Sequence, residues 1–440
     1  MTHARAAYHR PRRRSGSTSS SASSDTASTS SSGGEKQQRT RQLRHSHHDF
    51  GRTASSGSAS LSSASDEEST SDTTADENPS LAPLPPSVET ATVTSTANDD
   101  RAASSPAKPA PTSGDHNTGP YKLVRTYQGE KFFDGWNFWD KPDPTHGQVA
   151  YLDQEAAKAA GLISASSKSA VMRIDNSSKL APGQNRKSVR IHSREPVKLG
   201  SIVIADILRM PFGCATWPAY WTNGPNWPDG GEIDIVEGVH NDKVNQLTLH
   251  TKDSGCKLPS NPDITGKAVP ANVDCNAHNN GNTGCSWAES AEASYGQAFN
   301  AAGALISSGV RIIILLTRSA VLSGGGVLAL LFSKDAISIW FWSHGSKDLP
   351  ENIAQGSPDM ATWGKPSATW PKSSCDIAKY FADQELIFNI SLCGDWAGSA
   401  GVWALACKDK AATCSEFIAD PANFDEAVWE ITSVKVYSVL

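Results

Sequence analysis

The segment Gly231-Glu232-Ile233-Asp234-Ile235-Val236-Glu237-Gly238 alternates acidic and branched apolar residues, which is typical of a half-buried β-strand. Because side chains alternate between the two faces of a strand, the isoleucines share the core face while Glu232 and Asp234 share the other. Glu237 has the parity of the isoleucines, and an isolated carboxylate in a core is very costly. A β-bulge after Asp234 would return Glu237 to the face of the other acids. The segment therefore predicts a bulged strand with three carboxyl groups on one surface.

Short runs with the same period of two recur along the chain. Examples are 188–192 and 386–392, and Gly, Pro, Asn and Asp separate such runs from residue 121 to residue 437. Repeated short strands between turn signals predict an all-β sandwich or barrel. A single short helix is expected over 153–161. We expect residues 119–440 to form one large β domain, which is long enough for a substantial core.

Residues 1–118 have a different composition, dominated by Ser, Thr, Ala, Asp and Pro, with few aromatic or branched apolar residues. Such a segment buries too little apolar surface to fold, so we expect a disordered tail. The basic run 9–14 is interpreted as part of this solvated tail, with contact to an anionic membrane or nucleic acid as the alternative. The net charge of -6 is mild, and nothing later in the chain indicates nucleic-acid binding.

The eight cysteines have neither CxxC nor zinc-ligand spacing, and all lie at or after residue 214: Cys214, Cys256, Cys275, Cys285, Cys375, Cys393, Cys407 and Cys414. Their even number favours disulfides and an oxidising compartment, with buried free thiols as the alternative. The sequence leaves their connectivity open. No apolar stretch before residue 120 suits a signal peptide or a membrane span. Unconventional export, a misassigned N-terminus or an intracellular domain would each explain this conflict.

Two carboxyl groups on one strand face have a specific chemical use. Glycosidases flank the scissile bond with such a pair, and in retaining enzymes the two groups stand roughly 5–5.5 Å apart. Alternate residues of a strand are about 7 Å apart at Cα, and the bulge and side-chain reach would close the difference. Asp234, between the two glutamates, would help to keep one proton in the site. A solvated acidic face is the alternative, but it does not explain the alternating isoleucines.

Aromatic residues crowd the approach to this segment. Trp217, Trp221 and Trp227 precede it, and Trp227 lies in the Pro/Gly/Asn-rich loop 223–231. A tryptophan in such a loop can offer a flat apolar face to a sugar ring, whereas a Trp-rich core is the alternative. In the next expected strand, His250 faces the cleft and is placed to bind a sugar or a catalytic carboxylate. The alternative for His250 is an ordinary exposed polar residue.

On these residues the chain resembles glycoside hydrolase family 16, in particular the fungal laminarinase-like endo-1,3(4)-β-glucanases. The matching stretches are Tyr121–Val124, Gly129–Trp136, Lys187–Ile191, Met210–Trp221, Gly224–Pro228, Glu232–Glu237, Cys393–Gly398 and Ser433–Tyr437. The resemblance implies a concanavalin-like β-jelly-roll sandwich with a concave glucan-binding cleft. It also implies retaining endo-hydrolysis of β-1,3- or mixed β-1,3/1,4-glucan, in an extracellular or cell-wall location.

The resemblance also implies residue roles. Glu232 corresponds to the nucleophile, Asp234 to its helper and Glu237 to the acid/base. The residues expected to contact glucan are Trp227, His250, Trp396, Trp221 and Arg190. We expect β-glucan as the partner, a monomer, and no metal, cofactor, nucleic acid or membrane. A cell-wall glucan transglycosylase and a non-catalytic glucan-binding module on the same fold remain as alternatives.

The apolar stretch 304–323 departs from the family pattern, in which an Asn-Ala-Ala-Gly loop runs almost directly into a Gly-Gly-Gly-Val strand. Our hypothesis is that it is a translated intron or another gene-model artefact, and a transcript that encodes it would contradict this. A genuine insertion would interrupt a loop, where insertions are best tolerated. Asn176 begins a plausible glycosylation sequon. Asn389 begins a weaker one, because it lies in an expected strand.

Overall fold

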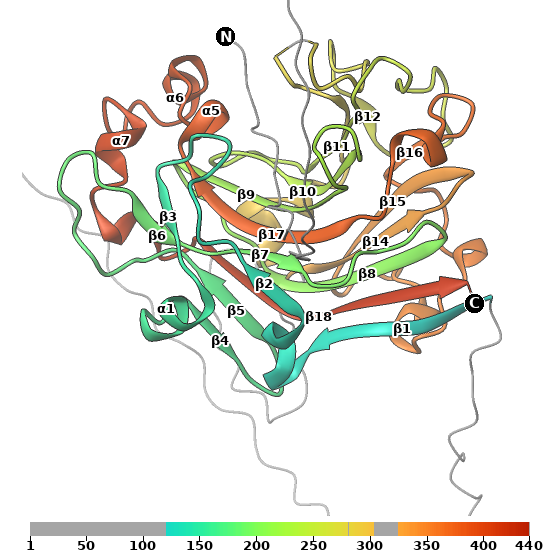
Figure 1. Ribbon diagram of the computed structural model, residues 1–440, viewed down its shortest axis with the longest axis horizontal. Coiled ribbons are helices and arrows are strands. Elements are labelled where there is room, and N and C mark those ends of the chain that lie inside the picture. Colours follow the sequence, from blue (N-terminus) through green and yellow to red (C-terminus); the bar gives the residue numbers. More distant parts are fainter. Residues whose placement is uncertain (1–119, 280, 303–323, 440) are drawn as a thin grey trace, which may run out of the picture. The chain divides into compact units, whose positions relative to one another are not determined.

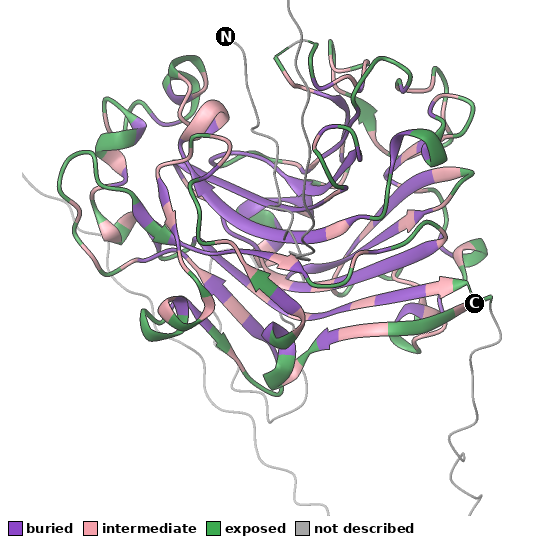
Figure 2. Ribbon diagram, in the orientation of Figure 1, coloured by how far each residue is buried: buried purple, intermediate pink, exposed green. Residues whose placement is uncertain are grey.

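The computed structural model describes residues 120–439, except residue 280 and residues 303–323. The predictions for the tail 1–118 and for 304–323 therefore lie outside the described residues. Two antiparallel sheets of eight strands each make up most of the described domain (Figure 1). They form the predicted all-β sandwich, and Figure 2 shows that the buried residues follow the strands of both sheets.

One sheet, called here the back sheet, has β18 (Val428–Val439) at its centre. One edge of β18 pairs with β8, while the other pairs first with β5 and then with β1. The remaining strands extend the back sheet on either side in the order β16-β15-β14-β8-β18-β5-β4. Their bounds are β1 (Tyr121–Gln128), β4 (Ile163–Ala165), β5 (Ala170–Arg173), β8 (Ser201–Arg209), β14 (Gly326–Phe332), β15 (Ala336–Ser343) and β16 (Ala368–Pro371).

The other sheet, called here the cleft sheet, contains the acidic segment in β10 (Glu232–Glu237). Its order is β12-β13-β11-β10-β9-β17-β7-β2. The other bounds are β2 (Trp136–Phe138), β7 (Arg190–Ser193), β9 (Thr216–Asn223), β11 (Gln246–His250), β12 (Lys267–Ala268), β13 (Cys285–Ala288) and β17 (Glu385–Leu392). The predicted run 386–392 is thus confirmed as part of β17.

The run 188–192 differs from its prediction, because it is divided between two strands. Its first residue ends β6 (Arg186–Ser188), which pairs in parallel with β3 (Val149–Tyr151) in a separate two-stranded sheet. Val189 lies between the two strands, and residues 190–192 belong to β7 of the cleft sheet. The alternating pattern is continuous, but its two halves find different partners, which sequence periodicity does not reveal.

Helices are short and lie between strands. The predicted helix 153–161 is present as α1 (Gln154–Ala159), where the side chain of Asp153 accepts a hydrogen bond from the backbone N–H of Ala156, an ordinary N-cap. The others are η1 (Gly129–Gly135), η2 (Glu292–Ser294), α2 (Gly296–Ala301), α3 (Glu351–Ala354), η3 (Met360–Thr362), α4 (Ile377–Tyr380), α5 (Gly394–Ala397), α6 (Ala400–Ala406), α7 (Cys414–Phe417) and η4 (Pro421–Phe424). None of the helices within 120–302 and 324–439 is long and apolar enough to cross a membrane.

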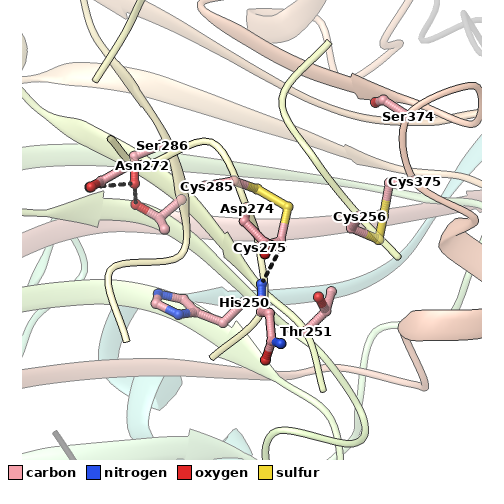
Figure 3. Close-up of a disulfide and its surroundings, with 12 residues drawn as sticks. His250, Thr251, Cys256, Asn272, Asp274, Cys275, Cys285, Ser286, Ser374 and Cys375 are labelled. Atoms are coloured by element: carbon pink, nitrogen blue, oxygen red, sulfur yellow. Dashed lines mark hydrogen bonds between the residues drawn. A yellow bond between two sulfur atoms is a disulfide. The ribbon is translucent and has the colours of Figure 1, made fainter. Parts of the chain in front are cut away.

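All eight cysteines form disulfides, as predicted. The pairs are Cys214–Cys407, Cys256–Cys375, Cys275–Cys285 and Cys393–Cys414. Figure 3 shows two of them beside His250, at the end of β11. There the backbone N–H of Thr251 donates to the carbonyl of Cys275 at 2.7 Å. The disulfides thus fasten the loops that flank the cleft sheet.

Candidate active site

The bulge predicted in β10 is present. Asp234 pairs with Thr248 of β11 and Glu237 with Gln246, so three steps along β10 correspond to two along β11. The register against β9 shifts in the same place. Ile233 and Ile235 are buried at 0% and 1% exposure, and Glu237 reaches the same cleft as Glu232. The extra residue therefore corrects the parity of Glu237 while the isoleucines stay in the core.

A cleft of about 690 Å³ lies over the cleft sheet, and both glutamates line it. Its walls come from β2, β7, β9, β10 and β17 and from the loops beside them. The tryptophan, basic and amide side chains that line it include Trp139, Arg190, His192, Trp217, Trp221, Trp227 and Asn389. Asp234, which lies between the two glutamates in the sequence, does not line the cleft, and its side chain is buried.

Each of the three acids contacts a different ring nitrogen. The indole N–H of Trp227 donates to Oε2 of Glu232, and the indole N–H of Trp217 donates to Oε1 of Glu237 at 2.9 Å. Nε2 of His250 lies 3.3 Å from Oδ2 of Asp234. An indole can only donate, so these two contacts favour carboxylate oxygens that accept. Glu232 is thus held by a tryptophan of the loop between β9 and β10, and Glu237 by a tryptophan at the start of β9.

The loop that carries Trp227 is closed by direct backbone contact between two glycines. A Cβ atom on Gly224 would lie 2.3 Å from the carbonyl oxygen of Gly230, which is closer than such atoms can approach. The N–H of Gly224 donates to the carbonyl of Gly231 at 2.9 Å. Only glycine permits this approach. The close contact of the two glycines folds the loop back, so that Trp227 reaches Glu232.

One wall of the cleft is a stack of a guanidinium group between two indoles. The Arg190 guanidinium carbon lies 4.9 Å from the centre of the Trp139 ring and 5.1 Å from that of Trp221. The indole N–H of Trp221 donates to the side-chain oxygen of Asn389 at 2.6 Å. Cation–π contacts with Arg190 and the hydrogen bond to Asn389 therefore restrain these indole rings. The wall is built from residues on four separate strands or loops.

His192 continues this wall. Nε of Arg190 donates to Nε2 of His192 at 2.9 Å, so that nitrogen carries no proton, and Nδ1 lies 3.2 Å from Oε2 of Glu385. Burial lowers the pKa of His192 from 6.5 to about 4, with the neighbouring Arg190 charge acting in the same direction. The imidazole is therefore neutral at pH 7, and it stacks on Trp139.

The structure places the predicted glucan-binding residues in two groups. Trp227, Trp221 and Arg190 line the cleft. His250 does not line the cleft as expected, because it is 2% exposed and its Nε2 faces Asp234. The alternative of an ordinary exposed polar residue is therefore wrong as well, and its contact with glucan stays a prediction. Trp396 is half-buried and packs edge-on against Trp217, with ring centres 5.7 Å apart.

Sequence reasoning missed Trp139, His192, Glu385 and Asn389. Asn389, which begins the weaker sequon, is 7% exposed, and its side-chain oxygen accepts from Trp221 in the cleft wall. The signal that was available is the polar parity of β7 and β17, where Arg190 and His192 alternate with a buried isoleucine.

The described residues contain one group of potential metal ligands, formed by Glu232, Asp234 and His250, whose ligand atoms lie within 4.8 Å of one another. This group coincides with the acidic segment. A cation bound there would neutralise the carboxylate that a double displacement needs as its nucleophile. The expectation that the site works without a metal stays a prediction.

Enzymes that cleave glycosidic bonds use a pair of carboxyl groups, with aromatic side chains beside them that contact the sugar rings. The same combination on a two-sheet β-sandwich indicates a glycoside hydrolase. The chain belongs to glycoside hydrolase family 16. The family model described as "XgeA-like, catalytic GH16 domain" matches residues 136–308 and 319–437. The ten positions between these two ranges fall inside the apolar stretch 304–323.

Similar proteins support the same family. A probable glycosidase of Schizosaccharomyces pombe is 40% identical over 319 residues, covering 72% of this chain and 69% of that protein. An endo-1,3(4)-β-glucanase of Arthroderma benhamiae is 37% identical over 324 residues, covering 72% of this chain and 65% of the relative. The chain spans only 46% of a probable endo-1,3(4)-β-glucanase of Aspergillus clavatus.

Solved structures agree with the fold. Laminarinase 16A from Phanerochaete chrysosporium, with 6-O-glucosyl-laminaritriose in both donor and acceptor sites, has a TM-score of 0.65 at 35% identity, covering 72% of this chain and 99% of that one. An elongating family 16 β-1,3-glucosyltransferase has a TM-score of 0.62 at 35% identity, covering 72% of this chain and 100% of that one.

Proposed function

We propose that the chain is a retaining endo-glycosidase that hydrolyses β-1,3- or mixed β-1,3/1,4-glucan. The observation that carries the proposal is the bulge of β10, which brings Glu237 to the same cleft as Glu232. Two carboxyl groups in one cleft are what a double displacement at a sugar carbon needs.

In the proposed reaction, a carboxylate oxygen of Glu232 attacks the anomeric carbon while Glu237 donates its proton to the departing glycosidic oxygen. The bond between that carbon and oxygen breaks, and a glycosyl ester of Glu232 forms. Glu237, now a carboxylate, takes a proton from a water molecule that attacks the same carbon and releases Glu232. Asp234, placed between the glutamates and contacted by His250, is proposed to keep the site's charge and proton in place.

The wall of Trp139, Arg190 and Trp221 is proposed to receive glucose rings. Stacked aromatic faces suit the C–H faces of β-linked glucose, and the fixed orientation of the rings lowers the ordering cost of binding. Laminarinase 16A, whose structure is 35% identical to this chain, holds β-glucans in its donor and acceptor sites. We extend that substrate class to this chain.

Transglycosylation is the second candidate function. It differs only in the acceptor that attacks the glycosyl ester, a sugar hydroxyl in place of water. Two similar structures favour keeping it: an elongating β-1,3-glucosyltransferase, and a mutant laminarinase that cyclises laminariheptaose. Product analysis at high acceptor concentration separates the two, because a transferase yields chains longer than the donor. The presence of all three acids argues against a non-catalytic binding module.

An extracellular or cell-wall location is part of the proposal. Four disulfides stabilise a protein in an oxidising compartment, and the fungal glucanase relatives share the catalytic domain. Cell fractionation with an antibody against the chain tests this, and recovery only in the cytosol would contradict it.

The test of the activity is laminarin hydrolysis by the full chain. Glu232→Gln and Glu237→Gln should each lower reducing-sugar release at least about 100-fold. The first variant removes the proposed nucleophile, and the second removes the proposed proton donor. Glu195→Gln is the matched control, since Glu195 is exposed and pairs with Arg125. Release that is unaffected by Glu232→Gln would refute the mechanism. A first product of α configuration in an NMR time course would refute retention.

A further inference from the structure

The bulge of β10 is bridged by the side chain of a residue outside the cleft. Asn245 immediately precedes β11 and is 1% exposed. Its Nδ2 donates to the carbonyl of Ile235 at 2.7 Å, and its Oδ1 accepts from the N–H of Glu237 at 2.9 Å. These two backbone groups lie where the pairing between β10 and β11 is interrupted. One amide group therefore replaces the strand partners that the bulge removes.

The chemistry of this bridge requires an amide. An inserted residue leaves an N–H and a C=O of the bulged strand without ladder partners, and each such group costs about 1–3 kcal/mol when buried and unsatisfied. Asparagine offers one donor and one acceptor in a plane. Aspartate keeps the acceptor for Glu237 but turns a second oxygen toward the Ile235 carbonyl, and leucine offers neither bond.

The backbone of Asn245 is held by two further hydrogen bonds. Its backbone N–H donates to Oγ of Ser294 at 3.0 Å, and its carbonyl accepts from the N–H of Glu289 at 2.9 Å. Ser294 belongs to η2, and Glu289 follows β13 directly. The bridge is thus anchored on the edge of the cleft sheet, outside the residues that line the cleft.

We propose that Asn245 is a positioning residue for the general acid, which rests on the proposed function because it takes Glu237 as that acid. Asn245 fixes the backbone of Glu237, and Trp217 fixes its carboxyl group. Together the two contacts set the point at which the proton reaches the glycosidic oxygen. Loss of the bridge lets the bulge relax and moves the carboxyl group away from that point, whereas Glu232, before the bulge, stays in place.

The experiment compares two substrates that differ in their need for the acid. Laminarin has a sugar leaving group that requires protonation. A 2,4-dinitrophenyl β-laminaribioside has a phenolate that leaves without a proton, so kcat/KM for it reports attack by Glu232 alone. The variants are Asn245→Ala and the near-isosteric Asn245→Asp, made in the full chain.

The chain offers a matched control in Asn300. Its Oδ1 accepts from the N–H of Met210 at 2.8 Å and its Nδ2 donates to the carbonyl of Met210 at 3.0 Å. Asn300→Ala therefore removes the same pair of side-chain-to-backbone bonds at a position that does not contact the carboxyl groups. Asn300 is less buried than Asn245, so Asn300→Ala should lose somewhat less stability, and the urea midpoint measures the loss in both variants.

We expect both Asn245 variants to lower kcat/KM on laminarin by about 10- to 100-fold, the size of effect that a small misplacement of a reacting group produces. On the dinitrophenyl substrate, kcat/KM should stay within about threefold of the wild type. Added azide should raise kcat on that substrate, because the anion attacks the glycosyl ester without needing the base. Asn300→Ala should leave both substrates unchanged.

Equal losses on both substrates, a loss on neither, or the same pattern in Asn300→Ala would overturn the positioning role. If Asn245→Ala does not fold, Asn245→Asp decides the question. Failure of the proposed function is recognised separately. In that case the wild type itself cleaves no laminarin and Glu237→Gln changes nothing, and the role of Asn245 falls with it.

Discussion

At the scale of single residues, the neutral imidazole of His192 joins the charges of the cleft wall. It accepts from Arg190 on one side and faces Glu385 on the other, so the guanidinium group and the carboxylate are linked through an uncharged ring. A protonated ring would place a second cation beside Arg190. Burial and that neighbouring charge both oppose it, which is why the pKa of His192 falls to about 4.

This pKa predicts a specific loss of stability in acid. Below pH 6.5 the histidine of the unfolded chain binds a proton that the folded protein excludes down to about pH 4. Unfolding therefore becomes easier as the pH falls through this window, by up to about 3 kcal/mol from this group. His192→Gln should reduce the drop in the free energy of unfolding between pH 7 and pH 4, measured in urea. His278→Gln, at an exposed position, should reproduce the wild-type drop, and equal drops in all three proteins would contradict the assignment.

At the scale of elements, the alternation in β10 was sufficient to predict the bulge, because parity is a local property of a strand. It also predicted correctly that Glu232 and Glu237 meet in one cleft. Asn245 could not be predicted, since its two partners exist only once the bulge has formed. Trp139 and Asn389 escaped for a related reason: they join the wall through strands that neighbour each other in space and not in sequence. The catalytic roles of the acids stay predictions.

The loop before β10 offers a test at the same scale. Gly224→Ala places a methyl group against the carbonyl of Gly230, so the loop must open and Trp227 must leave Glu232. We expect kcat/KM on laminarin to fall about 10-fold or more, with little change in global stability. Gly401→Ala is the control, since its added Cβ meets no atom within 4 Å in helix α6, and it should stabilise by up to about 1 kcal/mol. Wild-type kinetics in Gly224→Ala would contradict the closing role of the two glycines.

At the scale of the whole molecule, composition and periodicity predicted a sandwich, and the family match and the structure agree. The disulfide connectivity was beyond sequence reasoning, because it depends on which loops the two sheets bring together. Cys214 precedes β9, whereas Cys407 follows α6, 193 residues later. This bond therefore ties a central strand of the cleft sheet to the helical segment that carries Trp396. Cys275–Cys285, in contrast, closes a loop of 10 residues.

The difference in loop length predicts a difference in stability. A crosslink restricts the unfolded chain more when it joins residues further apart, so the double variant Cys214→Ala with Cys407→Ala should lose about 3–5 kcal/mol of unfolding free energy. The variant Cys275→Ala with Cys285→Ala should lose less, by the same reasoning. Urea unfolding followed by tryptophan fluorescence without reductant measures both. Removal of the long-range bond should also raise KM for laminarin, because the segment of Trp396 loosens against Trp217. A larger loss for the short loop would show that native-state contacts, and not restriction of the unfolded chain, dominate these bonds.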